Sequence, residues 1–426
     1  MQCAVSYGSD DVVRILAEHG ADLQHRSAAG IPAIHAAARG ETLSSLLEFP
    51  SRVDVDQLDD AGSTALHLDL STVNFKRLVN AGAKLEIQDK TAGDTALTCV
   101  AYFDNMECAE YLLKHGVDIN LASPCYGAPL HQACRRSNWD MMKMLIEHGA
   151  DVNQACDGLP GTPIQAALLR YDAEPPHPVE EMVNYLIAHG ADVTAEGGLL
   201  RYPLNAAALK GTPSLISLLL EKGAKTDVRD GMGRMPVHAA AFHGIDNFQT
   251  IIDRDGDINS RDEMGRTALH WAAQPGRAQV VEKILSLGSD AAVVDSPDID
   301  GWTALCWAAR GTDSWLDEDV AGEPQEQIKV MKLLLQHGAN RSVIVSAGGQ
   351  KWTPLKIARF SGQSAEVIEL LKSGLDSENT GREAGTSTSA DAESADLYQS
   401  RPANVRTSYC DACRCVSCSL RFLPLY

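Results

Sequence analysis

The feature that most constrains the fold of this chain is a short unit that recurs along most of its length. Its clearest copy, RDEMGRTALHWAAQPGRAQVVEKILSLGSDA, occupies residues 261–291. Thr267 stands where a helix N-cap is needed, because its hydroxyl can accept hydrogen bonds from backbone N–H groups of the first turn. A proline–glycine pair ends this helix, and a second helix with one apolar face is predicted over residues 278–287. We expect Gly288 to end the second helix in the left-handed conformation.

Two sequence features mark the other copies of this unit. A glycine ends the second helix of most copies, and these glycines are Gly20, Gly82, Gly116, Gly149, Gly190, Gly223, Gly288 and Gly338. A Thr-Ala/Pro-Leu-His motif, or a degraded form of it, opens the first helix at residues 64–67, 128–131, 235–238 and 267–270. Neither helix is long enough to be stable alone, so each unit must bury its apolar face against its neighbours.

The dominant spacing between the copies is about 33 residues, which is the ankyrin period. With so many motifs in register, the sequence resembles the ankyrin-repeat family over residues 1–375. The resemblance implies an all-α solenoid of about eleven helix–turn–helix repeats joined by β-turn loops. We therefore predict three regions: an ankyrin-repeat array at 1–375, a disordered acidic linker rich in Ser, Thr and Gly at 376–409, and a cysteine-rich tail at 410–426.

Some copies of the unit are irregular. The first copy has only residues 1–8 for its first helix. We therefore expect that the natural protein extends further N-terminally or that another domain covers this end, unless this copy is simply frayed. The copies within residues 31–84 are short, and Asp69 replaces a small residue there, which is expected to loosen the packing. Prolines predict a loop at residues 171–178, and an acidic insertion follows near residues 312–325.

Composition restricts the partner and the compartment. The chain of 426 residues has a formal net charge of −20, which repels phosphate backbones, so we expect no nucleic-acid partner. It contains no run of about 18 apolar residues and no signal peptide, and its helical cysteines lack paired spacings. We expect a monomeric protein of the cytoplasm or nucleus that has no membrane span and is not secreted.

No motif predicts catalysis. The sequence lacks a phosphate-binding loop, a zinc-protease HExxH motif and a nucleophile elbow. Its histidines recur at two fixed positions of the repeat, where we expect structural hydrogen bonds: His67, His131, His238 and His270 near the start of the first helix, and His19, His115, His148, His189 and His337 before the closing glycine. We therefore predict that the protein is not an enzyme.

The cysteines of the tail are the one candidate metal site. Cys410 and Cys413 form a C-x-x-C turn, whose two thiolates can converge on zinc. Residues 409–413 resemble the opening of a ZZ-type zinc finger, and residues 300–311 and 351–359 resemble the last repeats of fungal ankyrin proteins that end in such a finger. The later ligands of that finger are missing. A truncated finger, a thiol-rich tail without metal and a site of lipid attachment all stay open, and no other cofactor is expected.

The resemblance also implies where a partner binds. In ankyrin proteins the loop tips and the exposed side of the first helices line a groove. The matching tip residues here are Asp230, Met232, Arg234, Glu263, Met264, Arg266, Ile299, Asp300 and Trp302, and the matching helix residues are Phe242, His243, Gln274 and Arg310. Aromatic, Met and Arg side chains are frequent at interaction hot spots. Trp302 is expected to be exposed at the centre of this surface, unless it packs on the neighbouring loop, whereas Trp271 and Trp307 are expected in the core.

Three functions fit these features. The first is a non-enzymatic scaffold that binds one or more proteins through a rigid, preformed groove. The second is the sensor or regulatory arm of a larger signalling NTPase whose nucleotide-binding part lies upstream. The third is a zinc-finger adaptor, which depends wholly on the cysteine tail.

Overall fold

The computed structural model describes residues 1–372 except for 8, 69–70, 159, 170–177, 289–290, 312–323 and 348–349. The described chain divides into two compact units, Met1–Pro203 (unit 1) and residues 204–372 (unit 2). The predicted linker at 376–409, the predicted tail at 410–426 and Asp69 all lie outside the described residues.

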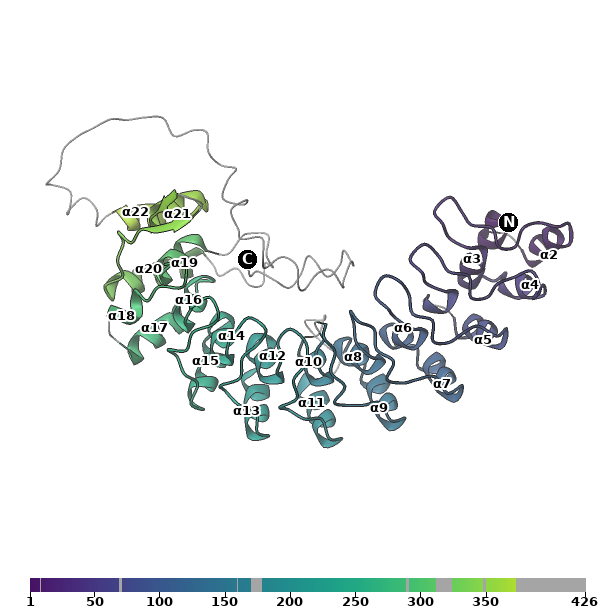
Figure 1. The fold of residues 1–426 in the computed structure, drawn as a ribbon, viewed down its shortest axis with the longest axis horizontal. Coiled ribbons are helices and arrows are strands. Elements are labelled where there is room, and N and C mark those ends of the chain that lie inside the picture. The colour runs from purple at the N-terminus through teal and green to yellow at the C-terminus, as the bar shows by residue number, and fades with distance from the viewer. Residues whose placement is uncertain are drawn as a thin grey trace, which may run out of the picture. The chain divides into compact units, whose positions relative to one another are not determined.

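Unit 1 consists of six pairs of short helices. Within it, first helices pack beside first helices and second helices beside second helices, so that each pair buries its apolar face against the next (Figure 1). The elements are α1 (Gln2–Tyr7), α2 (Asp10–Glu18), α3 (Ala33–Arg39), α4 (Leu43–Leu47), η1 (Ala65–His67), α5 (Thr72–Asn80), α6 (Ala96–Phe103), α7 (Met106–Lys114), α8 (Pro129–Arg135), α9 (Trp139–Glu147), α10 (Pro163–Leu168) and α11 (Val179–Ala188).

Unit 2 continues the same pattern with five pairs and one extra short helix. Its elements are α12 (Pro203–Lys210), α13 (Pro213–Glu221), α14 (Pro236–His243), α15 (Ile245–Ile252), α16 (Ala268–Ala273), α17 (Ala278–Leu287), α18 (Ala291–Val294), α19 (Ala304–Arg310), α20 (Pro324–Gln336), α21 (Pro354–Phe360) and α22 (Ala365–Lys372). A small antiparallel hairpin of β1 (Val345–Ala347) and β2 (Gln350–Trp352) precedes α21, with Val345 opposite Trp352. The described residues thus form eleven helix pairs, as predicted.

The helix ends follow the predicted chemistry with one exception. Seven of the eight closing glycines have a positive φ, for example +91° at Gly149 and +102° at Gly223, a conformation that costs glycine little. Gly288 was expected to do the same, and this prediction was wrong. Its φ is −144°, which is extended backbone, so α17 ends without the usual left-handed closure, and the next described element is the extra helix α18.

The shortened copies also appear in the structure. The first helix of the third pair is reduced to a single 3₁₀ turn, η1, and α4 spans only five residues. Short 3₁₀ turns have poorer hydrogen-bond geometry than α-helix. Unit 1 therefore contains the least regular part of the described array.

Amide side chains join several helix pairs to the pair before them. Asn74 Nδ2 in α5 donates to the carbonyl oxygens of Ala38 (2.9 Å) and Gly40 (2.7 Å), where α3 ends. Equivalent bonds run from Asn138 to Ala101, from Asn247 to Ala208 and Gly211, from Gln327 to Ala273, and from Gln363 to Arg310. These bonds satisfy carbonyl groups that a helix C-terminus leaves without a partner.

Candidate protein-binding surface

The histidines of the first helices bridge neighbouring repeats. In each case Nδ1 accepts a hydrogen bond from the backbone N–H of the N-cap residue, at 3.1 Å for Thr267 and His270, so Nε2 carries the proton. Nε2 then donates to a carbonyl of the following loop, as between His270 and Trp302 (3.2 Å) or His238 and Ser260 (3.0 Å). His67 and His131 make the same bridges in unit 1. The predicted structural role of this set is confirmed.

Burial keeps two of these bridging rings neutral. It lowers the pKa of both His131 and His270 to about 4, although hydrogen bonds to carbonyl oxygens partly oppose this shift. The second set of histidines ends the second helices, where Nδ1 lies 2.7–2.9 Å from the carbonyl oxygen four residues earlier: His19, His115, His148, His189 and His337. Both sets are therefore used by the fold itself.

Unit 2 carries a column of charged and aromatic side chains that runs through three successive repeats. We name it the Asp–Arg–Trp column, and its members are Asp230, Arg234, Asp262, Arg266, Trp271, Asp298, Trp302 and Trp307. Each repeat contributes an acid five positions before the helix N-cap, an Arg or Trp directly before the cap, and, in two of the three, a Trp on the first helix. Because the repeats stack, these side chains lie one beside the next.

The arginines of the column are buried, which corrects their predicted exposure at the loop tips. Arg234 Nε donates to Asp230 Oδ2 (2.6 Å), and Arg266 Nε donates to Asp262 Oδ2 (2.9 Å). All four side chains are at most 10% exposed. The guanidinium of Arg266 lies 4.1 Å from the centre of the Trp271 ring, where cation–π attraction adds to the ion pair. These arginines turn inward because a buried carboxylate and an indole face neutralise and cover them.

The tryptophans of the column differ in burial. Trp271 is almost fully buried, as predicted, and its Nε1 donates to Asp262 Oδ2 (3.0 Å). Trp307 was also expected in the core but is only half-buried, with Nε1 donating to Asp298 Oδ2 (2.9 Å). Trp302 is half-buried because its ring packs on Trp307, with 5.3 Å between the ring centres.

The other predicted binding residues fall into two groups. Two positions on first helices, Phe242 and Gln274, are buried, and Phe242 packs edge-on against Trp271. The prediction that these two are exposed was therefore wrong. The remaining residues reach solvent fully or in part: Met232, His243, Glu263, Met264, Ile299, Asp300, Trp302 and Arg310.

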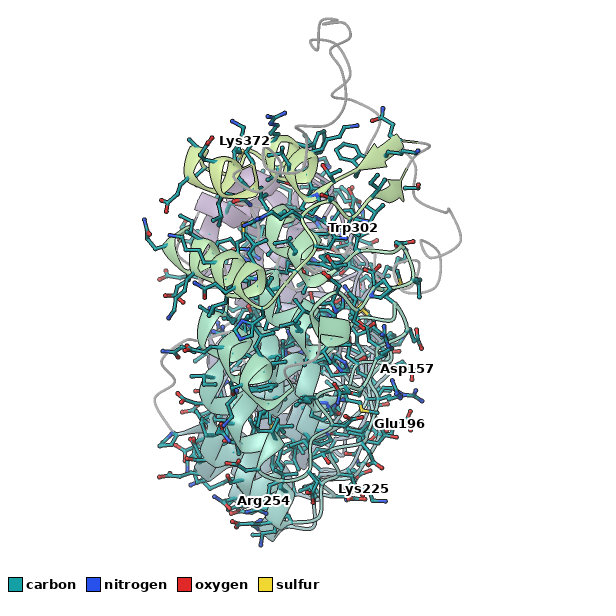
Figure 2. The ribbon with its side chains drawn as sticks, turned by 90° about the vertical axis from the view of Figure 1, so that its left-hand side faces the viewer. Asp157, Glu196, Lys225, Arg254, Trp302 and Lys372 are labelled. Atoms are coloured by element: carbon teal, nitrogen blue, oxygen red, sulfur yellow. The ribbon has the colours of Figure 1, made fainter. Side chains whose placement is uncertain are left out.

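The exposed residues gather beside Trp302. Met264 is 40% exposed and Ile299 is 64% exposed, and the backbone N–H of Ile299 donates to the carbonyl of Met264 (2.9 Å), which holds the two tips in register. In Figure 2, Trp302 lies on the loop side of unit 2, away from Lys372 at the end of α22. These residues and the exposed acids Asp300 and Glu263 belong to the same two neighbouring tips, and we name the group the Trp302 surface.

Sequence reasoning missed the acids that organise the column. Asp262 and Asp298 each accept hydrogen bonds from an indole and from loop backbone, yet neither was among the candidate residues. The pattern that reveals them is visible in DGMGR, DEMGR and DIDGW, where an acid precedes an Arg or Trp by four residues. Cys410 and Cys413, the predicted metal ligands, lie outside the described residues.

Comparison with known proteins identifies the repeats independently. A family model described as ankyrin repeats in three copies matches residues 71–156, 173–262 and 246–316, and another described as ankyrin repeats in many copies matches residues 1–46. Among the helices that the structure describes, none is long and apolar enough to cross a membrane.

Curated relatives are much longer than the part they share with this chain. An ankyrin repeat domain-containing protein, SAT10 of Stachybotrys chartarum, is 35% identical over 37% of this chain and 7% of its own length. The human transient receptor potential cation channel subfamily A member 1 is 23% identical over 88% of this chain and 39% of the channel. Dog inversin is 28% identical over 70% of this chain and 20% of inversin. The matched family models cover more than half of the sequence, and the chain belongs to the ankyrin-repeat family.

Proposed function

We propose that this protein is a non-enzymatic scaffold whose protein partner docks on the Trp302 surface of unit 2. Solenoid repeats bind through extended surfaces, which supports a protein-interaction role for the array as a whole. The observation that favours this particular surface is the exposure of Met264 and Ile299 directly beside a half-buried Trp302. An apolar centre with a polar edge is the usual anatomy of a binding hot spot.

The Asp–Arg–Trp column supports this proposal by making the surface rigid. Arg266 lies over two rings, at 4.1 Å from Trp271 and 5.5 Å from Trp307, and so ties two repeats together. Trp302 is held from behind by Trp307 and by the bond from its backbone N–H to Asp298 (2.7 Å). A surface that is ordered before binding loses little conformational entropy on association, which favours affinity.

A pull-down from cell lysate tests the proposal. The bait is the full chain, as the wild type and as the triple variant Met264→Ala, Ile299→Ala, Trp302→Ala. The matched control is Tyr102→Ala, Phe103→Ala in unit 1, because those two aromatic side chains are 40% and 42% exposed. Circular dichroism and thermal melting show whether each bait is folded.

We expect a specific partner to be retained by the wild type and by the unit 1 control, and lost by the triple variant. Retention of all partners by a folded triple variant contradicts the proposal, as does equal loss from both variants. The predicted regulatory arm of a larger NTPase and the predicted zinc adaptor concern parts of the protein outside the described residues, and both stay predictions.

A further inference from the structure

The column repeats one arrangement of charges, and one of its three copies departs from it. In the first copy Asp230 pairs with Arg234, and in the second Asp262 pairs with Arg266. In the third copy, the residue at the arginine position is Trp302. The stacked repeats therefore allow the three acids to be compared in nearly the same backbone setting.

The complete arrangement is seen at Asp262. One carboxylate oxygen, Oδ1, accepts from the backbone N–H of Arg266 (2.8 Å). The other, Oδ2, accepts from Arg266 Nε (2.9 Å) and from Trp271 Nε1 (3.0 Å). The guanidinium thus lies against an indole face and beside a carboxylate, a geometry in which a planar cation is both stacked and neutralised.

Asp298 keeps every part of this arrangement except the cation. Its Oδ1 accepts from the backbone N–H groups of Asp300 (3.0 Å) and Trp302 (2.7 Å), and its Oδ2 accepts from Trp307 Nε1 (2.9 Å). Within the part of the chain that the structure describes, Asp298 forms no ion pair: Arg266 interacts with it electrostatically, but the guanidinium of Arg266 is bonded to Asp262. Burial raises the pKa of the Asp298 carboxyl group. A charged carboxylate that lacks a cation is stabilised when one approaches.

The neighbouring cations are already placed elsewhere. The guanidinium groups of Arg266 and Arg310 each lie 5.5 Å from the ring of Trp307, and Arg266 is paired with Asp262. Among the described residues, none places a cation over the ring of Trp302. Next to this ring, Asp300 is exposed and adds a second carboxylate.

We propose that the partner supplies the missing cation: an arginine side chain that stacks on Trp302 beside Asp300 and Asp298, flanked by apolar residues that contact Met264 and Ile299. The inference rests on the proposed function, because it specifies the chemistry of the partner at the same surface. It also fits the formal net charge of −20, which attracts basic segments toward the protein. Arginine suits the site because its planar guanidinium can stack on an indole ring and, at the same time, donate hydrogen bonds to a carboxylate.

A peptide selection tests this inference. A library of random peptides displayed on phage is selected on the immobilised full chain, and the strongest peptide is synthesised with arginine and with citrulline, which has nearly the same shape but no charge. Affinity is measured by fluorescence anisotropy against the wild type, Asp300→Asn, Trp302→Ala and the double variant Met264→Ala, Ile299→Ala. If Trp302→Ala reduces helicity, the comparison of wild type with Asp300→Asn replaces it as the test. Asp300 is exposed and the change to Asn preserves the shape of the side chain, so this variant should stay folded.

We expect the selected peptides to share an arginine beside apolar residues. Replacing it with citrulline or changing Trp302→Ala should weaken binding by about tenfold, Asp300→Asn should weaken it several-fold, and added salt should weaken it further. Peptides that need Met264 and Ile299 but contain no required cation would overturn this inference and leave the proposed function standing. Peptides whose affinity is the same for every variant would overturn both.

Discussion

Units 1 and 2 are built from the same helix pair, yet equivalent positions carry different side chains. Directly before the helix N-cap, unit 2 has Arg234, Arg266, Trp302 and Trp352, whereas unit 1 has Ile31, Ser63, Asp94, Gly127 and Gly161. Four positions after the cap, two repeats of unit 2 have a tryptophan, Trp271 and Trp307, and two others have Ala239 and Ile357. Unit 1 has no tryptophan there; its residues are Ala36, Leu68, Cys99, Gln132 and Ala166. The Asp–Arg–Trp column is thus confined to unit 2.

The two units share what the fold requires. Bridging histidines occur in both, at His67 and His131 in unit 1 and at His238 and His270 in unit 2. Amide bridges between helix pairs also occur in both, from Asn74 and from Asn247. The comparison shows that the repeat can be built without the column, so the column is an addition to the fold that we assign to binding.

Unit 1 presents a different exposed group. Tyr102 and Phe103 form an edge-to-face pair at the end of α6, with ring centres 5.2 Å apart, and the guanidinium of Arg136 lies 4.8 Å from the Tyr102 ring. This group has no counterpart of the buried acids at Asp230 and Asp262. It therefore serves as the natural control surface for experiments on unit 2.

The largest effect is expected from Asp262→Asn. The change leaves the buried guanidinium of Arg266 without its carboxylate, and breaking a buried ion pair in this way costs about 3–5 kcal/mol. Urea denaturation gives the free energy of unfolding, and hydrogen exchange assigns the loss to unit 2. Glu263→Gln is the control, since this exposed neighbour should change stability by less than about 0.5 kcal/mol. Equal effects of the two changes would contradict the role given to the column.

Acid should destabilise unit 2 more steeply than unit 1. In the folded state His131 and His270 have a pKa of about 4, so between pH 6.5 and 4 each of them takes up a proton only when the protein unfolds. As the pH is lowered through this window, each histidine therefore reduces the free energy of unfolding by about 1.4 kcal/mol per pH unit. Asp94 in unit 1 opposes this, because burial raises its pKa to about 6 and the folded state therefore takes up its proton first. Asp298 in unit 2 acts in the same direction as Asp94, but burial also lowers the pKa of His238 and His243 in unit 2, which adds to the effect of His270.

Hydrogen exchange from pH 7 to pH 5 measures this difference in each unit. His270→Asn should flatten the pH dependence of unit 2, and Asp94→Asn should make that of unit 1 steeper. A pH dependence that is unchanged in His270→Asn would show that this ring is not the group that titrates.

The amide bridges should matter equally in the two units. Asn74→Ala in unit 1 and Asn247→Ala in unit 2 each leave buried carbonyl groups without a donor, at a cost of about 1–3 kcal/mol. Melting curves of the two variants provide the measurement. A large effect in one unit alone would mean that the units are not built on the same scaffold.

The smallest effects concern two glycines that follow second helices. At Gly149 in unit 1 the φ of +91° strains any other residue, so Gly149→Ala should cost about 1–2 kcal/mol. At Gly288 in unit 2 the φ of −144° suits alanine and nothing lies within 4 Å of the added Cβ, so Gly288→Ala should be neutral or stabilise by about 0.5 kcal/mol. Denaturation midpoints of the two variants test this contrast, and equal destabilisation would contradict it.

The sequence predicts the fold well because the repeat period, the capping residues and the bridging histidines are local patterns that recur. It predicts the candidate site less well. Whether Arg266 points to solvent or folds back on Trp271 depends on the burial of Asp262 and on packing against the rings of Trp271 and Trp307. The tip sequence contains Asp262 but does not show that it is buried. The reduction of one first helix to η1 and the extended conformation of Gly288 were likewise not predicted from the repeat motifs.

The most direct test of the account is amide hydrogen exchange of the full chain, free and bound to the partner that the pull-down captures. The account predicts that binding slows exchange in the loop tips at residues 262–266 and 298–302 of unit 2, and leaves residues 102–104 of unit 1 unchanged. Slowing at 102–104 without slowing at 298–302 would contradict it, because the partner would then bind the unit that lacks the column.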